Sequence, residues 1–455
     1  MLWCKHLHKE KSGPCPDVDM SQVKPNHISQ FWRASEFAYR QILNRSLTHG
    51  VMSLRYLLPC QSAKIRIHRC FWLCGLPQVP IPIYIMMEIF IWLRWVLFSG
   101  WRGTLRAVRR LGPGIKNRDG IGIITQFKRV LCMALFHCVP PSEVYAFRFY
   151  HTDQRAQVWD YVFTHELPAF HRWRNAALDE NSESLRLLQD KWSQSELLAK
   201  DGIPVVSTLQ RVPQGNLFDA DRYLDKFSEI VCKPRHGSGA RGIFVVSKKN
   251  ADDALIVYGT RAGVLTVESS WAALRKAFAR DDYLIQPFMK NHPVLARLCL
   301  TDDVVTIRII TESRANSRIE TYCTLLEIPA FKKKNDSFAP RGHVILPIDL
   351  ETGKIMRFPG ILLHSNSREN YERVYSGMDQ HIIPFWEALC KNSIIAHKRF
   401  YDVYAIAWDY VVTPDGPFLL EGNTGWATRM PQIITGGLLR DELGLLSSQN
   451  RKTPR

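Results

Sequence analysis

The feature that most constrains the fold is a change of hydrophobic pattern at Gly202-Ile203-Pro204. After this point, short runs of β-branched and aromatic residues alternate with a few segments of helical spacing. The expected strands are 229–233, 243–247, 283–289, 304–311, 320–327, 344–349, 404–412 and 417–421, and the expected helices are 271–279 and 381–400. Strands interleaved with a few helices indicate an α+β architecture.

The part of the chain before this change shows a different pattern. Residues 30–70, 120–140 and 145–200 carry apolar side chains at helical spacing, so this region is predicted to be mainly α-helical. A chain of 455 residues exceeds the size at which a single hydrophobic core stops growing. We therefore expect two or three structural units.

The basic character of the chain belongs to its N-terminal third. Residues 1–129 hold 20 Lys/Arg and six Asp/Glu, and the formal net charge of the whole chain is +17. Such a region suggests an anionic membrane surface as partner, with a solvated basic helical surface as the alternative. Nucleic acid is not expected, because no zinc-finger, RNA-binding or basic-zipper signature is present. The 11 cysteines follow no metal or disulfide spacing, which fits a reducing cytoplasm.

Residues 79–99 form a nearly continuous apolar stretch that Glu88 and Arg94 interrupt. Its length is about that of a membrane-spanning helix. The two charges near its middle offset most of the gain from its aliphatic side chains. Three interpretations remain open: a buried core helix, which we favour, a helix at a membrane interface, and a true span. Tryptophans beside arginines, such as Trp101, favour the interfacial helix over the span.

A glycine-rich segment at residues 236–242 matches the pattern G-x-G-x-x-G. Strand-like residues lie on both sides of it, whereas the dinucleotide-binding fold requires a helix after the glycines. A glycine loop between strands indicates a flap whose N–H groups can cover phosphates; an ordinary hairpin turn is the alternative. Lys233 ends the preceding strand and needs a negative partner, such as a phosphate, unless it extends to solvent.

A Pro-Asp-Gly turn, Pro414–Gly416, joins two strand-like runs near the C-terminus. If these three residues form the loop, Thr413 pairs with Pro417, and Asp409 then lies directly opposite Glu421. Two carboxylates in that relation repel each other on a bare sheet. A two-residue turn would instead move Glu421 to the other face of the hairpin.

Asn423 follows two residues after Glu421 and therefore shares its face. Two carboxylates and an amide oxygen suit a hard cation such as Mg²⁺, while two solvated acids on a surface hairpin are the alternative. Arg308 lies in an apolar strand-like run, Thr306–Thr311, and also needs an anion. A phosphate under transfer and a structural ion pair are both open for it.

The order of these motifs resembles the ATP-grasp superfamily. The closest resemblance is to the sugar-transfer-associated ATP-grasp family, which is similar to α-L-glutamate ligase-type proteins. In chain order, the motifs are Asp190-Lys191, Gly202-Ile203-Pro204, Lys233-Pro234 with the glycine loop, Tyr283–Met289, Thr306-Ile307-Arg308, Trp408-Asp409 and Glu421-Gly422-Asn423. The resemblance covers roughly residues 100–440.

This resemblance implies a role for each matching residue. The ATP-binding set is Lys191, Lys233, Gly237, Ser238, Gly239, Gly242 and the adenine hinge Gln286, Pro287, Phe288 and Met289. Arg308 and Lys233 are the catalytic candidates that contact the transferred phosphate. Asp409, Glu421 and Asn423 are expected to hold Mg²⁺, with Mn²⁺ as an alternative. Arg429 is a candidate anchor for a substrate carboxylate.

The resemblance also implies the domain organisation. We expect an ATP-grasp fold of two α+β subdomains that grip ATP, the smaller at 185–289 with the glycine loop and the larger at 290–440 with the metal site. A basic helical region at 1–70 and a helical region at 71–184 precede them. A polar tail, 441–455, ends the chain.

The resulting hypothesis is an ATP- and Mg²⁺-dependent carboxylate–amine ligase that activates a carboxylate as an acylphosphate. It would act on a small-molecule or glycan-linked acceptor in cell-surface polysaccharide or peptide-like modification. One alternative is a phosphotransferase acting on a sugar hydroxyl. Another is a non-catalytic ATP-binding module of a membrane-linked polysaccharide assembly. The expected location is the cytoplasm, and a peripheral position at the inner face of the membrane is left open.

Overall fold

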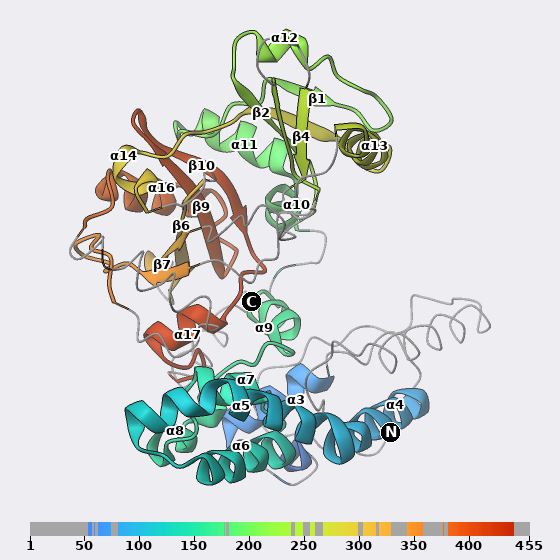
Figure 1. The fold of residues 1–455 in the computed structure, drawn as a ribbon, viewed down its shortest axis with the longest axis vertical. Coiled ribbons are helices and arrows are strands. Elements are labelled where there is room, and N and C mark those ends of the chain that lie inside the picture. Colours follow the sequence, from blue (N-terminus) through green and yellow to red (C-terminus); the bar gives the residue numbers. More distant parts are fainter. Residues whose placement is uncertain are drawn as a thin grey trace, which may run out of the picture. The chain divides into compact units, whose positions relative to one another are not determined.

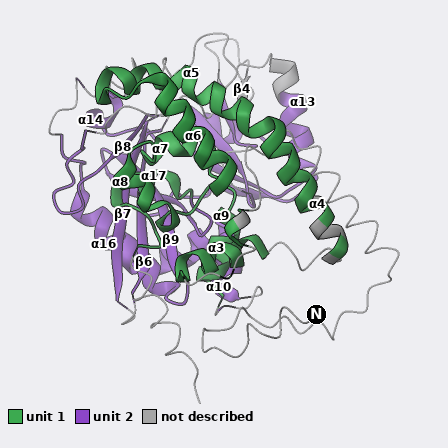
Figure 2. Ribbon diagram, turned by 90° about the horizontal axis from the view of Figure 1, so that it is seen from below, with its two compact units in different colours: residues 1–177, 427–455 green, residues 178–426 purple. Residues whose placement is uncertain are grey.

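The chain forms two compact units, residues 1–177 with 427–455 and residues 178–426 (Figure 2). The computed structural model describes residues 53–56, 59, 62–73, 81–176, 178, 182–237, 242–248, 255–259, 267–298, 304–314, 318–328, 344–357, 376 and 381–440. The helical spacing at 30–52 and the polar tail at 441–455 lie outside the described residues.

The first unit, called here the helical unit, contains helices and no strands in its described part, as predicted. Its elements are η1 (Leu54–Tyr56), α3 (Ala63–Leu73), α4 (Ile81–Arg94), the π-helical η3 (Trp95–Ser99), α5 (Gly100–Asp119), α6 (Ile123–His137), α7 (Pro141–Ala146), α8 (Thr152–Ala156), η4 (Val158–Asp160), α9 (Leu167–Arg174) and α17 (Arg429–Thr435) (Figure 1). The helical pattern predicted at 145–200 takes the form of several short helices.

Within the apolar stretch predicted at 79–99, the described residues 81–99 are helical, and the helix continues without a break from α4 through η3 into α5. One side of this helix is buried. Ile91 and Trp95 lie in the core, and the indole Nε1 of Trp95 donates to the Ala134 carbonyl at 2.7 Å. Glu88 is buried on the same side and accepts a hydrogen bond from Trp72 Nε1 at 2.9 Å. None of the described helices combines the length and the apolar character that crossing a membrane requires.

The C-terminal helix α17 is hydrogen-bonded to the helical unit. The side chain of Gln432 accepts from the Val162 N–H at 2.7 Å and donates to the Val162 carbonyl at 2.8 Å. The N–H of Leu439 donates to the Asp160 carbonyl at 2.8 Å. Residues 427–440, which the sequence placed with the larger α+β subdomain, therefore pack with helices from the beginning of the chain.

The first sheet of unit 178–426 has the strand order β1-β5-β2-β3-β4, and every pairing in it is antiparallel. Its strands are β1 (Gln210–Val212), β2 (Glu229–Pro234), β3 (Phe244–Lys248), β4 (Leu255–Gly259) and β5 (Tyr283–Pro287). Residues from β2, β3 and β5 form a hydrophobic core with α12 (Asp221–Leu224) and α13 (Val267–Phe278). The strands β2, β3 and β5 were predicted, whereas β1 and β4 were not.

The second sheet of this unit has the order β10-β9-β6-β7-β8 and is also antiparallel. Its strands are β6 (Thr306–Ser313), β7 (Ile319–Ile328), β8 (Val344–Pro347), β9 (Ala405–Thr413) and β10 (Gly416–Asn423), all of which were predicted. The other helices are α10 (Glu183–Gln189), α11 (Lys191–Lys200), α14 (Pro293–Ala296) and α16 (Trp386–Arg399). Two sheets with accompanying helices confirm the α+β class.

One face of the second sheet is covered by α16, which packs on β6, β7 and β9. His397 of this helix lies buried between the Thr311 hydroxyl, 2.7 Å from Nδ1, and the Val403 carbonyl, 3.0 Å from Nε2. The hydroxyl of Ser393 donates to the Tyr410 hydroxyl at 3.1 Å. Side chains alternate between the faces of a strand, so the neighbours of Tyr410 project from the other face.

Candidate functional site

The candidate site is built on that other face of the second sheet. Arg308 on β6 pairs directly with Asp409 on β9, and Asp409 pairs directly with Glu421 on β10. Asn423 lies two residues beyond Glu421 and shares its face. Three adjacent strands therefore bring a guanidinium, two carboxylates and an amide onto one face. In the sequence, Arg308 on β6 lies more than a hundred residues before the other three groups, which belong to β9 and β10.

The predicted pairing of Asp409 with Glu421 is present, but the predicted turn is wrong. Thr413 pairs with Gly416 and not with Pro417, so the loop consists of two residues, Pro414 and Asp415. A bulge between Leu419 and Glu421 then shifts the register by one residue. A bulge adds one unpaired residue to one strand, so this shift places Glu421 opposite Asp409 again.

Arg308 forms ion pairs with both neighbouring strands. Its Nε and NH2 donate to the two oxygens of Asp409 at 2.7 and 2.9 Å, and its NH1 lies 2.8 Å from Glu327 Oε1 on β7. Burial disfavours the Arg308 cation, but Asp409 and Glu327 outweigh this and raise its pKa. Burial raises the pKa of the Asp409 carboxyl, and Arg308 opposes that rise. The anion that Arg308 contacts in this structure is thus a carboxylate, and its contact with a transferred phosphate stays a prediction.

Asn423 lies between the two carboxylates. Its Nδ2 is 3.1 Å from Glu421 Oε1 and 3.4 Å from Asp409 Oδ2. Because one amide nitrogen lies within hydrogen-bonding distance of both carboxylates, oxygens of the two acids lie close to the same point. A small hard cation at that place would find two carboxylates, and rotation of the amide would supply a third oxygen. The donor chemistry therefore fits Mg²⁺.

The described residues contain no cluster of three or more His, Cys, Asp or Glu side chains suited to a metal ion. The site consequently offers Mg²⁺ only two carboxylates and one amide. This is the usual composition of a site in which the phosphates of the substrate complete the coordination, because Mg²⁺ keeps few protein ligands. A permanent metal centre held by protein side chains alone would need more.

Two lysines reach this place from the first half of the unit. Lys233 of β2 is buried, and its Nζ donates to the carbonyl of Leu420, the residue at the bulge, at 3.4 Å. Lys191 Nζ lies 3.6 Å from Glu421 Oε2. Burial lowers the pKa of Lys233 to about 8; Glu421 opposes the shift and Lys191 adds to it. With Arg308, the site holds three cations, and the carboxylates of Asp409, Glu421 and Glu327 balance them. The strand-end lysine, Lys233, does not extend to solvent.

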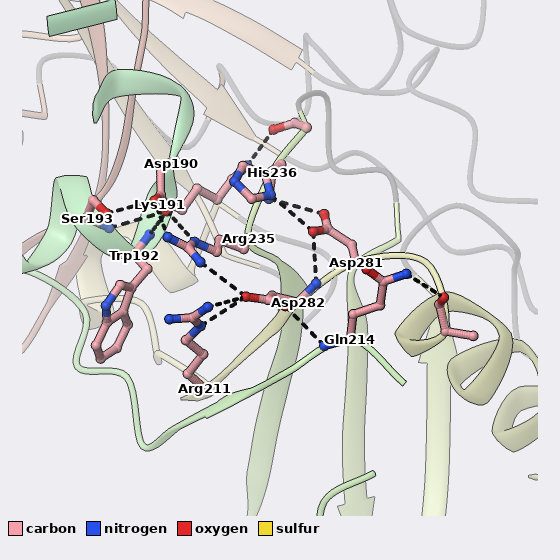
Figure 3. A network of polar contacts seen from close by, with 12 residues as sticks. Asp190, Lys191, Trp192, Ser193, Arg211, Gln214, Arg235, His236, Asp281 and Asp282 are labelled. Atoms are coloured by element: carbon pink, nitrogen blue, oxygen red, sulfur yellow. Dashed lines mark hydrogen bonds and ion pairs between the residues drawn. The ribbon is translucent and has the colours of Figure 1, made fainter. Parts of the chain in front are cut away.

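A polar network fixes Lys191 at the beginning of α11 (Figure 3). Asp190 caps this helix by accepting from the N–H groups of Trp192 and Ser193 at 3.1 and 3.3 Å. Arg235, two residues after Lys233, donates to both oxygens of Asp190 at 2.8 and 2.5 Å. These contacts join the start of α11 to the end of β2, so the two lysines are held as a pair.

The network continues from Arg235 to the loop before β5. Arg235 NH1 donates to Asp282 at 3.1 Å, and Arg211 of β1 donates to the same oxygen at 2.6 Å. His236 donates its backbone N–H to Asp281 at 3.3 Å. Ion pairs of Arg235 therefore fix the base of the glycine loop at the end of β2.

Gln194 attaches α11 to β10 beside the site. Its Nε2 donates to the Gly422 carbonyl at 3.1 Å, and its Oε1 accepts from the Gly422 N–H at 2.8 Å. A Cβ at Gly422 would lie 2.4 Å from the Trp408 ring, so any other residue at this position would require the ring or the strand to move. Gln194 was not predicted from the sequence, because an amide within a helix gives no local signal of such a contact.

The predicted hinge lies at the end of β5 and just beyond it. Gln286 is buried, and its Nε2 donates to the Val206 carbonyl at 3.2 Å and to Thr208 Oγ1 at 3.3 Å. The N–H of Phe288 donates to the Glu229 carbonyl at 3.1 Å. Gln286 therefore has a structural role, and adenine binding by Pro287, Phe288 and Met289 remains a prediction.

The glycine segment connects β2 to β3, which pair as an antiparallel hairpin. This is the predicted arrangement of a glycine loop between two strands. Gly237 has a φ of 97°, which favours glycine, and its carbonyl accepts a hydrogen bond from Lys191 Nζ. The Gly242 carbonyl accepts from the Tyr283 hydroxyl at 3.0 Å. Ser238 and Gly239 lie outside the described residues.

Arg429, the candidate substrate anchor, belongs to the helical unit and begins α17. Its NH2 donates to the Ser142 carbonyl at 3.4 Å. Burial lowers the pKa of Arg429, and Glu143 opposes this. Glu143 is itself buried and lies close to Thr164. The side chain thus has partners within its own unit, and its role in substrate binding remains a prediction.

Two antiparallel sheets, with a carboxylate–amide face on one and a lysine and a glycine hairpin on the other, define the ATP-grasp class of proteins. The model of the sugar-transfer associated ATP-grasp family matches residues 177–446. The chain belongs to this family, which confirms the resemblance seen in the sequence. No curated protein matches the chain.

Several solved structures are similar to part of the chain. Biotin carboxylase from Campylobacter jejuni has 14% identity and a TM-score of 0.34, over 60% of this chain and 48% of that one. D-alanine–D-alanine ligase from Bacillus anthracis has 15% identity and a TM-score of 0.35, over 59% and 71%. N5-carboxyaminoimidazole ribonucleotide synthetase from Thermotoga maritima has 11% identity and a TM-score of 0.29, over 57% and 48%. The chain thus spans about half the length of the biotin carboxylase.

Proposed function

We propose that this chain is an ATP- and Mg²⁺-dependent ligase that activates a carboxylate as an acylphosphate for attack by an amine. The observation that carries the proposal is the convergence of Arg308, Asp409, Glu421 and Asn423 on one sheet face, within reach of Lys191 and Lys233. Cations that surround a small group of acids suit a bound polyphosphate and its metal ion better than they suit a neutral ligand.

The triphosphate would lie along this face, beneath the glycine hairpin. Lys191 and Lys233 would bind its oxygens, and the backbone N–H groups of the loop would cover them. Asp409, Glu421 and Asn423 would hold Mg²⁺, which neutralises the phosphate charge when it is bound. Asp409 would then exchange part of its contact with Arg308 for the metal, leaving guanidinium N–H groups for the transferred phosphoryl group.

The proposed reaction has two steps. A carboxylate oxygen of the substrate attacks the γ-phosphorus, and the bond from that phosphorus to the ADP oxygen breaks. An amine nitrogen then attacks the acyl carbon, phosphate leaves, and the amine loses a proton. Most of the acceleration would come from positioning and charge neutralisation by Arg308 and Lys233. The association of the family with sugar transfer favours a glycan-linked acceptor.

The test is an ADP-release assay over a panel of carboxylates with hydroxylamine as a general amine. We expect ADP and an acyl hydroxamate in equal amounts. The Asp409→Asn substitution should lower the rate by at least about 100-fold, since it removes a metal ligand. The matched control is Asp415→Asn, because Asp415 is exposed at the turn of the same hairpin.

Each outcome separates the alternatives. ADP together with a phosphorylated alcohol would identify a phosphotransferase acting on a hydroxyl. An Asp409→Asn variant as active as the wild type would remove the metal assignment. A rise in melting temperature with Mg-ATP but no ADP release with any acceptor would favour the non-catalytic ATP-binding module. No rise at all would remove the ATP site, because a ligand at 100 times its dissociation constant should stabilise the fold by about 2.7 kcal/mol.

A further inference from the structure

The helix formed by α4, η3 and α5 leaves large apolar side chains exposed along one side. Those with the greatest exposed fractions are Met86 (70%), Leu97 (59%), Phe98 (57%) and Phe90 (52%), and they are joined by Ile89, Leu93, Trp101 and Leu105. Their spacing of three and four residues places most of them on one side of the helix. We call this set the outer apolar face.

The outer apolar face leads into a basic surface. Within α5, the exposed side chains beside Trp101 and Leu105 are arginines: Arg102, Arg106, Arg109 and Arg110. The sequence from residue 89 to residue 118 holds seven Lys/Arg and no Asp or Glu. Glu88, the nearest acid before it, is buried on the opposite side and hydrogen-bonded to Trp72, and burial raises its pKa to about 7. Asp119, at the end of α5, is ion-paired with Arg118. The side chains described as exposed from residue 89 to residue 118 are therefore mainly apolar and cationic.

We propose that this face binds the surface of an anionic phospholipid bilayer, with the helix lying in the plane of the interface. The apolar stretch from residue 86 to residue 105 is about 29 Å long at the usual rise of a helix. Its side chains would enter the acyl boundary, as those of interfacial amphipathic helices do. The arginines would extend to the phosphate groups, and Trp101 lies where the apolar stretch meets them.

The arginines beside the outer apolar face favour a bilayer over a second copy of this chain as the partner that covers it. A second copy of this segment would add further arginines, and residues 89–118 hold no carboxylate to balance them. Anionic headgroups supply that balance. This inference is independent of the proposed enzymatic function, because it rests on helices outside residues 178–426.

The test is flotation of the full chain with vesicles of phosphatidylcholine alone and of phosphatidylcholine with phosphatidylglycerol. We expect binding to the anionic vesicles and weaker binding at high salt, because ions screen the arginines. The double variant Phe90→Asp, Leu97→Asp should lower the partition coefficient at least about tenfold, because both apolar side chains are lost from the interface. The double variant Arg102→Gln, Arg106→Gln should lower it about fivefold for each arginine.

Leu217→Asp is the matched control, since Leu217 is an equally exposed leucine (60%) in unit 178–426, and it should bind as the wild type does. Circular dichroism melting curves would verify that each variant is folded, and the arginine variant tests the face even if the aspartates disturb the helix. Absence of binding to anionic vesicles, or equal binding by the outer-face and control variants, would overturn the proposal. A wild-type dimer in light scattering that Phe90→Asp, Leu97→Asp makes monomeric would show that a second copy covers the face.

Discussion

At the scale of single residues, the site depends on buried charges that balance one another. Asp409 is buried, and Arg308 provides the two hydrogen bonds that offset its desolvation. Removing one partner of a buried ion pair strongly destabilises the fold, because the other charge then stays buried without compensation. The sequence had suggested that two facing carboxylates need a metal. In the structure, Arg308 and Lys191 already neutralise them, so Mg²⁺ is an addition to a stable arrangement.

The pKa of Lys233 gives the site a pH dependence. Because burial lowers this pKa to about 8, the ammonium group is present below that pH and is lost above it. ATP affinity should therefore weaken as pH rises through about 8, by up to about tenfold per pH unit, as one proton is linked to binding. Isothermal titration of Mg-ATP across this range measures the slope.

Two variants control that measurement. Lys233→Met should bind Mg-ATP weakly and without this slope, whereas Lys354→Met, which changes an exposed lysine of the same unit, should keep it. A dissociation constant for the wild type that stays level on both sides of about pH 8 would show that the Lys233 ammonium is not a phosphate ligand.

At the scale of secondary-structure elements, the contact between α11 and β10 positions the site. Gln194 satisfies both backbone groups of Gly422, and Lys191 lies one turn earlier on the same helix. Gln194→Ala would leave a buried N–H and a buried carbonyl without partners, at about 1–3 kcal/mol for each. We therefore expect a lower free energy of unfolding in urea and a higher KM for ATP.

Gln189→Ala is the matched control, since Gln189 is exposed at the end of α10. It should change neither quantity. If Gln194→Ala lowers stability but leaves the KM for ATP unchanged, the helix does not position Lys191.

The elements themselves show what the sequence could predict. The strands of the second sheet have clear β-branched runs, and all five were found. β1 has three residues and exists only through its pairing with β5, so it gives no period-two signal. The pairing of Asp409 with Glu421 was predicted through a three-residue loop, whereas the chain uses a shorter loop and a bulge. The shorter loop and the bulge shift the strand register in opposite directions, so Glu421 still lies opposite Asp409. A bulge leaves no signal in the local sequence pattern and could not be predicted.

At the scale of the whole molecule, the chain combines an ATP-grasp unit with a helical unit. Only part of the helical unit's organisation could be predicted from the sequence. The helical content of the first unit was predictable from spacing. The return of residues 427–440 to that unit was not, because the bonds between Gln432 and Val162 join residues 270 positions apart. Partner residues such as Glu327 were also missed, although a glutamate within the apolar run Leu325–Ile328 was a visible signal.

The most direct test of the central claim is hydrogen–deuterium exchange with and without Mg-ATP. We expect slower exchange in three segments of unit 178–426: the hairpin 405–423, the end of β2 with the start of α11, and the hinge 283–289. The Asp409→Asn variant should lose this protection. Unchanged exchange in all three segments, or protection confined to the helical unit, would contradict an ATP site on this sheet face.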